Sequence, residues 1–400
     1  MVTVAHPQAP LSPTAHPDAA DPTAAHDTAA HPAAAHPATG TGRLTLATRH
    51  LGPNWYAAVM GTAIIAGAGS TLPVRFPGLR TACTAVWAFS LLLLAALLAA
   101  RTLHWIHHRD QARAHLLDPA VAPFYGCLSM ALLAVGGGAL LVGEDWIGTS
   151  AAVALDAVLF VAGTAIGLAA AVAIPYLMAV KHRAEPGQAS PVWLLPLVAP
   201  MVSAALGPLL VPHLPAGQAQ KTLLFACFAM FGLSLLATLV MLPMIFARLL
   251  TGGPFPLALT PALFLVLGPL GQSTTAVNKF ADTAAAGVVP APYDQGFAVF
   301  AVLYGVPVMG FALLWLALAG AMVVRARRRG MRFAMTWWAF TFPVGTCVTG
   351  AEGLGKHTGL AVYDWLALAL YALLVTAWAV ALTQTLRGVL DGTLLAAPRR

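Results

Sequence analysis

The sequence predicts an all-α polytopic membrane protein with ten transmembrane helices, arranged as five helical-hairpin repeats around a central pore. Hydrophobic residues make up 59% of the 400 residues and charged residues only 9%, with a mean hydropathy of +0.79. A soluble domain carries about 25% charged residues, so this composition excludes an ordinary soluble enzyme. The second observation is a series of ten apolar spans, and the third is their regular spacing along the chain.

Residues 1–50 precede the first apolar span and are rich in Pro, Ala, Thr, Asp and His. Such a tract cannot bury a core, and we expect a disordered cytoplasmic tail without the apolar run of a signal peptide. Weak metal binding or pH sensing by the tail is the alternative to a solvated chain. The transmembrane domain is expected at 51–390, followed by a short cytoplasmic tail at 391–400. The dipeptide Ala-His recurs in the N-terminal tail, at His6, His16, His26, His31 and His36.

The apolar spans are each near or above the roughly 20 residues that a membrane-spanning helix needs. The first is the shortest and must extend toward its flanking residues to cross a bilayer. The spans are 54–70, 82–103, 122–142, 148–178, 191–212, 221–247, 256–277, 295–323, 333–351 and 359–386.

Odd-numbered spans carry Gly and Pro at their centres, whereas even-numbered spans are mostly plain Leu, Ala and Val. Marking the odd spans at Gly61, Met130, Pro200, Pro269 and Pro343 gives separations of 69, 70, 69 and 74 residues. A period of this length indicates repeated copies of one structural unit. We therefore predict five hairpins, with the odd helices inside and the even helices against lipid.

Basic residues set the expected orientation. With the N-terminus inside, the cytoplasmic segments hold 16 of the 21 Lys and Arg residues, and the outer loops hold Arg75, Arg80, Lys221, Lys279 and Lys356. This asymmetry follows the positive-inside rule and places both termini in the cytoplasm. The same rule accounts for the formal charge of +7, so no nucleic-acid partner is expected.

The ninth span contains the most unusual stretch, residues 335–350. Pro343 cannot donate a backbone hydrogen bond, and Gly345 thins the helix beside the hydroxyls of Thr341 and Thr346. Irregular helices of this kind are tolerated in a membrane where protein encloses them or where they line a water-filled path. With Phe340 and Phe342 flanking the proline, the stretch is typical of a pore wall with an aromatic plug. The alternative is an internal helix whose Gly and Pro serve only helix contacts.

The odd spans as drawn contain no ionisable side chain between their ends, and Lys279 and Glu352 fall just beyond spans seven and nine. A tightly binding, ion-coupled pump would show an intramembrane charge. Neutral hydroxyl dipoles favour weak binding and fast passage instead, although each hydroxyl could equally bond to a neighbouring backbone. The predicted pore-lining residues are Gly61, Thr62, Ser129, Pro200, Ser203, Pro269, Gly271, Thr341, Pro343, Gly345 and Thr346.

Asp156 lies farther inside a span than any other acidic residue. It is the candidate proton site if transport is coupled to protons, but its nearness to the outer loop favours a position at the outer interface. His104 and His108 are four residues apart, as two metal ligands on one helix face would be. No third ligand accompanies them, and no phosphate loop, catalytic triad or zinc motif is present. We expect no metal, no cofactor and no enzymatic activity.

Three motifs carry a resemblance to a known family. They are LGPNWYAAVMGTA at 51–63, LGPLGQS at 267–273 and WWAFTFP at 337–343. Together they resemble the tellurite-resistance/dicarboxylate transporter family, which includes TehA-like proteins, fungal malate and sulfite transporters and plant slow anion channels.

The resemblance implies ten helices in five hairpins around a central pore, usually assembled as a homotrimer in the bacterial plasma membrane. It implies an anion channel or permease for C4-dicarboxylate, sulfite, tellurite or inorganic anions, with an aromatic residue of the ninth helix closing the pore. Phe342 matches that position best, and Phe340 is the second choice. A proton-coupled dicarboxylate symporter using Asp156 is the alternative function.

Overall fold

The computed structural model describes residues 51–182 and 186–394, and throughout these ranges the regular structure is helical, without a β-strand. The N-terminal tail, at residues 1–50, lies outside the described residues. Each of the ten predicted spans coincides with a helical segment, and the helix ends differ from the predicted bounds by up to 11 residues, the largest difference being at the end of span seven, Val288 against 277.

Five helices are short and largely buried, and they correspond to the odd-numbered spans. A 3-10 helix precedes each of them, and proline stands within all but the last of these 3-10 helices. Proline suits this position because the first N–H groups of a helix have no partner inside the helix. The pairs are η1 (Pro53–Trp55) with α2 (Tyr56–Thr71), η2 (Ala122–Phe124) with α5 (Tyr125–Gly138), η6 (Pro191–Trp193) with α8 (Leu194–Leu206), η9 (Leu257–Val266) with α10 (Leu267–Thr283), and η11 (Met335–Phe340) with α12 (Phe342–Thr358).

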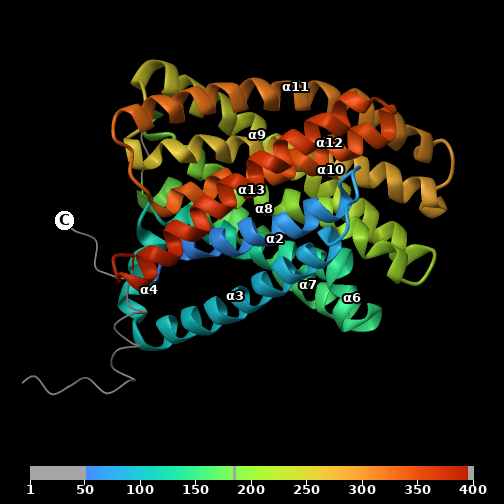
Figure 1. Cartoon of the computed structure of the whole chain (residues 1–400), viewed down its shortest axis with the longest axis horizontal. Helices are drawn as coiled ribbons and strands as arrows, with labels where there is room; N and C mark the ends of the chain where they lie inside the picture. Colours follow the sequence, from blue (N-terminus) through green and yellow to red (C-terminus); the bar gives the residue numbers. More distant parts are fainter. Residues whose placement is uncertain (1–50, 183–185, 395–400) are drawn as a thin grey trace, which may run out of the picture.

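Five longer helices correspond to the even-numbered spans: α3 (Leu79–His107), α7 (Thr149–Leu177), α9 (Gln218–Gly252), α11 (Tyr293–Arg328) and α13 (Ala361–Leu390). Two shorter helices, α4 (Arg109–Leu117) and α6 (Glu144–Ile147), lie at opposite ends of the bundle (Figure 1). Single π-helical turns extend three helices, at η3 (Ala139–Gly143), η4 (Met178–His182) and η10 (Ala284–Val288).

The two sets differ sharply in burial. In the most apolar 18-residue windows of the segments containing α5, α8 and α10, 83–89% of the residues are buried, compared with 22–33% in the five long helices. Within the described residues, eight helical segments are long and apolar enough to cross a membrane. The two predicted spans outside this set are those that contain α2 and α12, of 16 and 17 residues.

The short helices contact one another in a closed cyclic order, α2–α5–α8–α10–α12 and back to α2. Each also packs against the long helix that follows it in the chain, giving the pairs α2–α3, α5–α7, α8–α9, α10–α11 and α12–α13. Figure 1 shows α3 and α11 on opposite sides of the bundle with the short helices between them. The long helices carry most of the exposed large apolar side chains, such as Leu92, Val172, Leu236 and Leu303.

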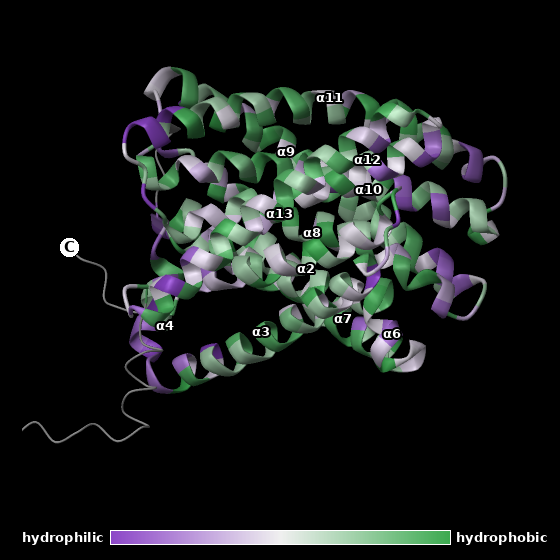
Figure 2. Ribbon diagram, viewed as in Figure 1, coloured by the Kyte–Doolittle hydropathy of each residue, from purple (hydrophilic) through white to green (hydrophobic). Residues whose placement is uncertain are grey.

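Hydropathy divides the bundle along its length. Figure 2 shows hydrophilic segments gathered at the two ends and hydrophobic segments along the sides between them. Apolar side chains of a soluble protein would not be exposed in so broad a band. The band is what a bilayer covers, with the polar ends in water.

Glycines allow the inner helices to approach closely. A Cβ atom on Gly126 of α5 would lie 2.5 Å from the carbonyl oxygen of Leu195 in α8. A Cβ atom on Gly353 of α12 would lie 2.6 Å from the side chain of Asn278 in α10. Small residues serve membrane helix contacts in this way because packing, rather than hydrophobicity, holds such helices together.

The sequence suggested that the ninth span is a single kinked helix, but the structure divides it into two helices. Its 3-10 helix ends at Phe340, Thr341 adopts φ −95° and ψ −80°, and a new α-helix begins at Phe342. Pro343 therefore lies in the first turn, where its missing N–H leaves no bond broken. The first backbone bond after the break joins the Gly345 amide to the Thr341 carbonyl over 3.0 Å.

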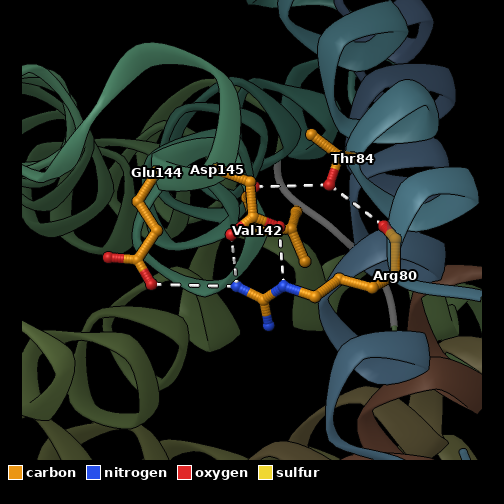
Figure 3. A network of polar contacts seen from close by, with 5 residues as sticks. All are labelled: Arg80, Thr84, Val142, Glu144 and Asp145. Atoms are coloured by element: carbon orange, nitrogen blue, oxygen red, sulfur yellow. Dashed lines mark hydrogen bonds and ion pairs between the residues drawn. The ribbon is translucent and has the colours of Figure 1, made fainter.

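One ion-pair network joins the ends of α3 and α6 (Figure 3). The Nε and Nη2 atoms of Arg80 donate to the two carboxylate oxygens of Asp145 over 2.6 and 2.7 Å, and Glu144 lies 3.8 Å from Nη2. Because the Arg80 side chain is 54% exposed, water screens this pair, and we assign it about 1 kcal/mol or less. Its role is to align the first two hairpins rather than to hold the fold.

Candidate functional site

A large cavity opens within the ring of short helices. Its volume is about 520 Å³, and residues of all five short helices line it, among them Ile64, Ala134, Leu206, Gln272 and Phe342. Most lining residues come from the C-terminal parts of these helices, the end that the charge distribution assigns to the outside. We call this space the outer cavity.

Two much smaller cavities follow toward the N-terminal ends of the short helices. The first has a volume of about 10 Å³ and is lined by Met60, Met130, Leu195 and Leu265 among others. The second, of about 20 Å³, shares Met60, Leu195 and Leu265 with the first. A single water molecule needs at least about 10–15 Å³, so this apolar part of the axis, the inner throat, has no room for a hydrated ion.

Phe342 separates the two regions. Among the described residues, it alone lines both the outer cavity and the first throat cavity. Its side chain is 2% exposed and belongs to the main hydrophobic core. The break at Thr341 starts α12 at this residue, which places the ring where the throat meets the outer cavity.

The walls of the outer cavity differ in polarity. On α10 the lining residues Gln272, Thr275, Lys279 and Asp282 are spaced three or four apart, the spacing of one helix face, and Thr349, Glu352 and Lys356 repeat this spacing on α12. The opposite wall comes from α5, α8 and the turns that directly follow them, and contributes Ala134, Gly138, Leu141, Ala205, Leu206 and Leu209. The cavity is therefore amphipathic.

Contacts between the two polar stripes form successive layers. Thr275 and Thr349 share a hydrogen bond of 2.7 Å between their hydroxyls. One helical turn outward, Lys279 and Glu352 both line the cavity, and Glu352 Oε2 accepts a 2.6 Å hydrogen bond from Thr71 of α2.

At the rim of the outer cavity, Lys356 Nζ donates to Asp282 Oδ1 over 2.5 Å. The charged lining residues balance, with three cations and three carboxylates among the described residues: Arg75, Lys279, Lys356, Asp282, Glu352 and Asp364.

Lys279 and Glu352 correct the sequence-based view that the inner spans carry no charge. The predicted spans ended at residues 277 and 351, but α10 continues to Thr283 and α12 to Thr358. Both charged residues thus lie within helices and face the cavity. Their spacing with Gln272 and Thr349 was the sequence signal that could have revealed them.

The hydroxyls predicted to line a pore make hydrogen bonds within and between helices. Ser129 donates to the Gly163 carbonyl over 2.7 Å, and Ser203 accepts a 2.9 Å bond from Thr164, so both face α7. Thr62 donates to Ala58 and accepts from Trp378 of α13. The remaining two bond to backbone carbonyls of their own segment, Thr341 to Trp338 and Thr346 to Pro343.

The small residues among the predicted lining residues serve packing. Gly61 faces Thr341 and Trp338, Gly271 faces the backbone of Thr346 and Cys347, and Gly345 faces Ile64. Pro200 and Pro269 are buried but line none of the three cavities. Of the predicted lining residues, only Pro343 joins Phe342 at a cavity wall.

Phe340 lies elsewhere. Its ring packs edge-on against Phe264 of η9, with centroids 4.8 Å apart, and against Trp337 at 5.8 Å. It lines none of the three cavities, so of the two aromatic residues only Phe342 lies between the outer cavity and the inner throat.

Asp156 is buried, with 2% of its surface exposed, and does not reach the outer interface as expected. It lies where α7 packs on α5, with its Oδ1 beside Gly136, and its Oδ2 has no hydrogen-bond partner among the described residues. It lines none of the three cavities.

A third histidine, His115, lies beside His104 and His108 at the end of α3. The ring of His104 stacks on His115 of α4 with centroids 5.5 Å apart and lies 6.0 Å from His108. Within residues 51–182 and 186–394, no group of three or more His, Cys, Asp or Glu residues has an arrangement suited to holding a metal ion.

Sequence comparison connects this architecture to known proteins. The model of the voltage-dependent anion channel family, SLAC1, matches residues 50–386. The chain belongs to this family. The SLAC1 family is the same group as the tellurite-resistance/dicarboxylate transporters that the three motifs indicated, so that resemblance is confirmed.

Individual relatives are similar over most of their length. An uncharacterized transporter of Methanocaldococcus jannaschii is 28% identical over 344 residues, covering 85% of this chain and 94% of the relative. A sulfite efflux pump of Arthroderma otae is 26% identical over 346 residues, with coverage of 85% and 91%. A putative malic acid transport protein of Schizosaccharomyces pombe is 23% identical over 332 residues, with coverage of 78% and 74%.

Proposed function

We propose that this SLAC1-family protein passes small anions across the bacterial plasma membrane along the axis of the α2–α5–α8–α10–α12 ring, and that Phe342 closes this path. The observation that carries the proposal is the position of Phe342 between the outer cavity and the inner throat. A phenyl ring cannot replace the water around an anion, so passage requires the ring to move.

The proposed topology has ten membrane crossings in five hairpins, with both termini in the cytoplasm. It is supported by the closed cyclic packing of the short helices and by the pairing of each with the following long helix. Crossings by α2 and α12 are included because both are enclosed by neighbours and extended by the 3-10 helices η1 and η11. A homotrimer is the expected assembly.

The substrates proposed are sulfite, C4-dicarboxylates such as malate, and small inorganic anions, tellurite among them. The relatives that are named for sulfite efflux and malic acid transport support the first two classes. Lys279 and Arg75 supply positive charge in the outer cavity, while the apolar inner throat binds no ion tightly. This combination favours transient occupancy over a high-affinity site.

A proton-coupled symporter using Asp156 is the second candidate. A buried carboxylate with an unpartnered oxygen is the observation in its favour. Its position on the α5–α7 contact, outside all three cavities, favours a role in helix packing instead.

The test is anion flux through the full-length protein in liposomes, measured for sulfite, malate, succinate, nitrate and chloride. We expect flux of at least one anion above protein-free liposomes, and a larger flux with Phe342→Ala. If neither protein carries any of the five anions, this function is wrong. Flux that requires a pH gradient and is lost in Asp156→Asn would establish the symporter.

A further inference from the structure

Five arginines gather where the chain leaves α11 and turns toward α12: Arg325, Arg327, Arg328, Arg329 and Arg332. We call residues 325–332 the arginine turn. The chain has no acidic residue between Asp294 and Glu352, and in residues 51–182 and 186–394 no carboxylate lies within ion-pair distance of these guanidinium groups. The positive-inside rule accounts for basic residues at this end of the bundle, but not for five of them within eight positions.

The backbone of the arginine turn is fixed by its own hydrogen bonds. The Gly330 amide donates to the Arg327 carbonyl, and the Met331 amide donates to the Ala326 carbonyl, both over 3.0 Å. With Gly330 at φ 88°, these bonds form a Schellman motif, which satisfies carbonyl groups at the end of a helix. The backbone thus caps α11 by itself, and the arginine side chains are not needed as caps.

Arg327 is the one arginine of the turn whose side chain is held by the protein. Its Nη1 atom donates to the Met331 carbonyl over 2.9 Å, and its Cζ atom lies 5.3 Å from the centroid of the Trp337 ring. A cation–π contact of this kind orients the guanidinium group, whose other N–H groups remain available as donors. The side chains of the other four arginines make no hydrogen bond to any of the described residues.

The exposed face of α11 leads directly into the arginine turn. Leu314, Ala317, Ala321 and Val324 are exposed at spacings of three and four residues, the pattern of one helix face. Arg328 is exposed and continues this face one turn beyond Val324, the last exposed large apolar residue of α11. In Figure 2 the hydrophobic ribbon of α11 gives way to a hydrophilic segment at this end.

The length of α11 places Arg328 at the depth of lipid headgroups. The helix has 36 residues and is therefore about 54 Å long at 1.5 Å per residue. The hydrocarbon core of a bilayer is roughly 30 Å thick, so the last turn of α11 extends beyond it. The change from exposed apolar residues to arginine marks where the acyl chains end and the headgroups begin.

We propose that the arginine turn is a binding site for anionic phospholipids in the leaflet that surrounds this end of the bundle. The phosphate lies against Arg328 and its neighbours, since the forked N–H groups of a guanidinium match phosphate oxygens, and the acyl chains lie along the exposed face of α11. A zwitterionic lipid presents the same phosphate beside an ammonium group, which the arginines repel. This inference goes beyond the proposed anion path and does not depend on it.

A competition between two lipids tests the site. Full-length protein in detergent micelles is incubated with equal amounts of phosphatidylglycerol and of phosphatidylcholine whose acyl chains are deuterated to separate the masses. Native mass spectrometry then gives the ratio of the two bound lipids. We expect phosphatidylglycerol to be preferred about 10-fold, because each basic residue beside a membrane attracts anionic lipid by roughly five-fold and salt screens part of this attraction. Glycerol 1-phosphate, which carries the phosphate without acyl chains, should not displace the lipid at equal concentration.

Two double variants locate the preference. Arg328→Gln combined with Arg329→Gln removes two charges from the arginine turn and should bring the ratio toward one. Arg109→Gln combined with Arg113→Gln removes two charges from α4 at the same end of the bundle (Figure 1) and should leave the ratio nearly unchanged. All four side chains are exposed, so both double variants should keep the thermal transition of the unmodified protein.

Four outcomes overturn the inference. Equal binding of the two lipids by the unmodified protein is the first, and a preference that survives the loss of Arg328 and Arg329 is the second. An equal loss of preference in both double variants would mean that the charge of the whole end attracts lipid without a site. Displacement by glycerol 1-phosphate would assign the arginines to a soluble phosphate compound. Anion flux is not measured in this test, so the proposed function can fail while the lipid site stands.

Discussion

Truncation of Phe342 tests the gate most directly. The residue is 2% exposed and lies between the outer cavity, of about 520 Å³, and a throat cavity of about 10 Å³. Removing a buried Phe side chain costs about 3–5 kcal/mol in soluble proteins. An anion that passes must displace the same ring from the same contacts. We therefore take this free energy as the most by which Phe342→Ala can lower the barrier to passage. At 1.4 kcal/mol per factor of ten, flux should rise by up to about 100- to 4,000-fold.

The assay is nitrate flux into liposomes at matched amounts of folded protein, with the thermal transition recorded in parallel. Phe340→Ala is the matched control, because it removes an equal ring from a contact with Phe264 outside the cavities. It should lower stability without raising flux. Lower stability and unchanged flux in both variants would refute the gate, and a gain with Phe340→Ala alone would move it by two residues.

Met60 provides a second check on the same reasoning, since it lines both throat cavities. If Phe342→Ala leaves flux unchanged but Met60→Ala raises it, the closing element is the apolar throat and the role assigned to Phe342 is wrong.

Three further outcomes are expected. Asp156→Asn should leave anion flux and its pH dependence nearly unchanged, because the carboxylate lies outside the cavities; loss of flux at normal folded yield would favour proton coupling. Gly126→Ala places a methyl 2.5 Å from the Leu195 carbonyl oxygen and should cost about 1–3 kcal/mol of stability, measured against Gly296→Ala, whose added methyl meets no atom within 4 Å. Deletion of residues 1–45 should preserve membrane insertion and basal flux; a shortened protein that fails to assemble would contradict a solvated tail.

The helical class and the division into buried and exposed helices followed from the sequence, because hydropathy and periodicity record the surroundings of a helix. Even spans of plain Leu and Ala became the exposed helices, and odd spans with central Gly and Pro became the buried ones. The break in the ninth span was located less accurately. Pro343 cannot donate a backbone hydrogen bond, which fits either a kink within one helix or the first turn of a new helix. The non-helical conformation of Thr341 shows that a new helix begins here.

The cavity walls were harder to predict. Regular spacing gives the depth of a residue in the membrane but not the side of the helix on which it lies, and an inner helix is buried on every side. Ser129 and Thr62 have the expected burial but face α7 and α13. Lys279 and Glu352 were placed outside the spans because a hydropathy plot assigns charge to water-exposed loops. Water in a cavity inside the ring can hydrate a charged side chain equally well, so the helix need not end at that residue.

The closed ring of short helices has a consequence for biogenesis. Gly61 of the first hairpin receives Thr341 and Trp338, and Gly69 faces Tyr371 of the last long helix, so these sites wait until nearly the whole chain has left the ribosome. Until α12 is made, the sides of α2 and α10 that will contact it have no helix packed against them. Because the chain is made from its N-terminus, α12 and α13 are the last helices to join the ring. A chain that ends before them leaves the facing sides of α2 and α10 without a packing partner.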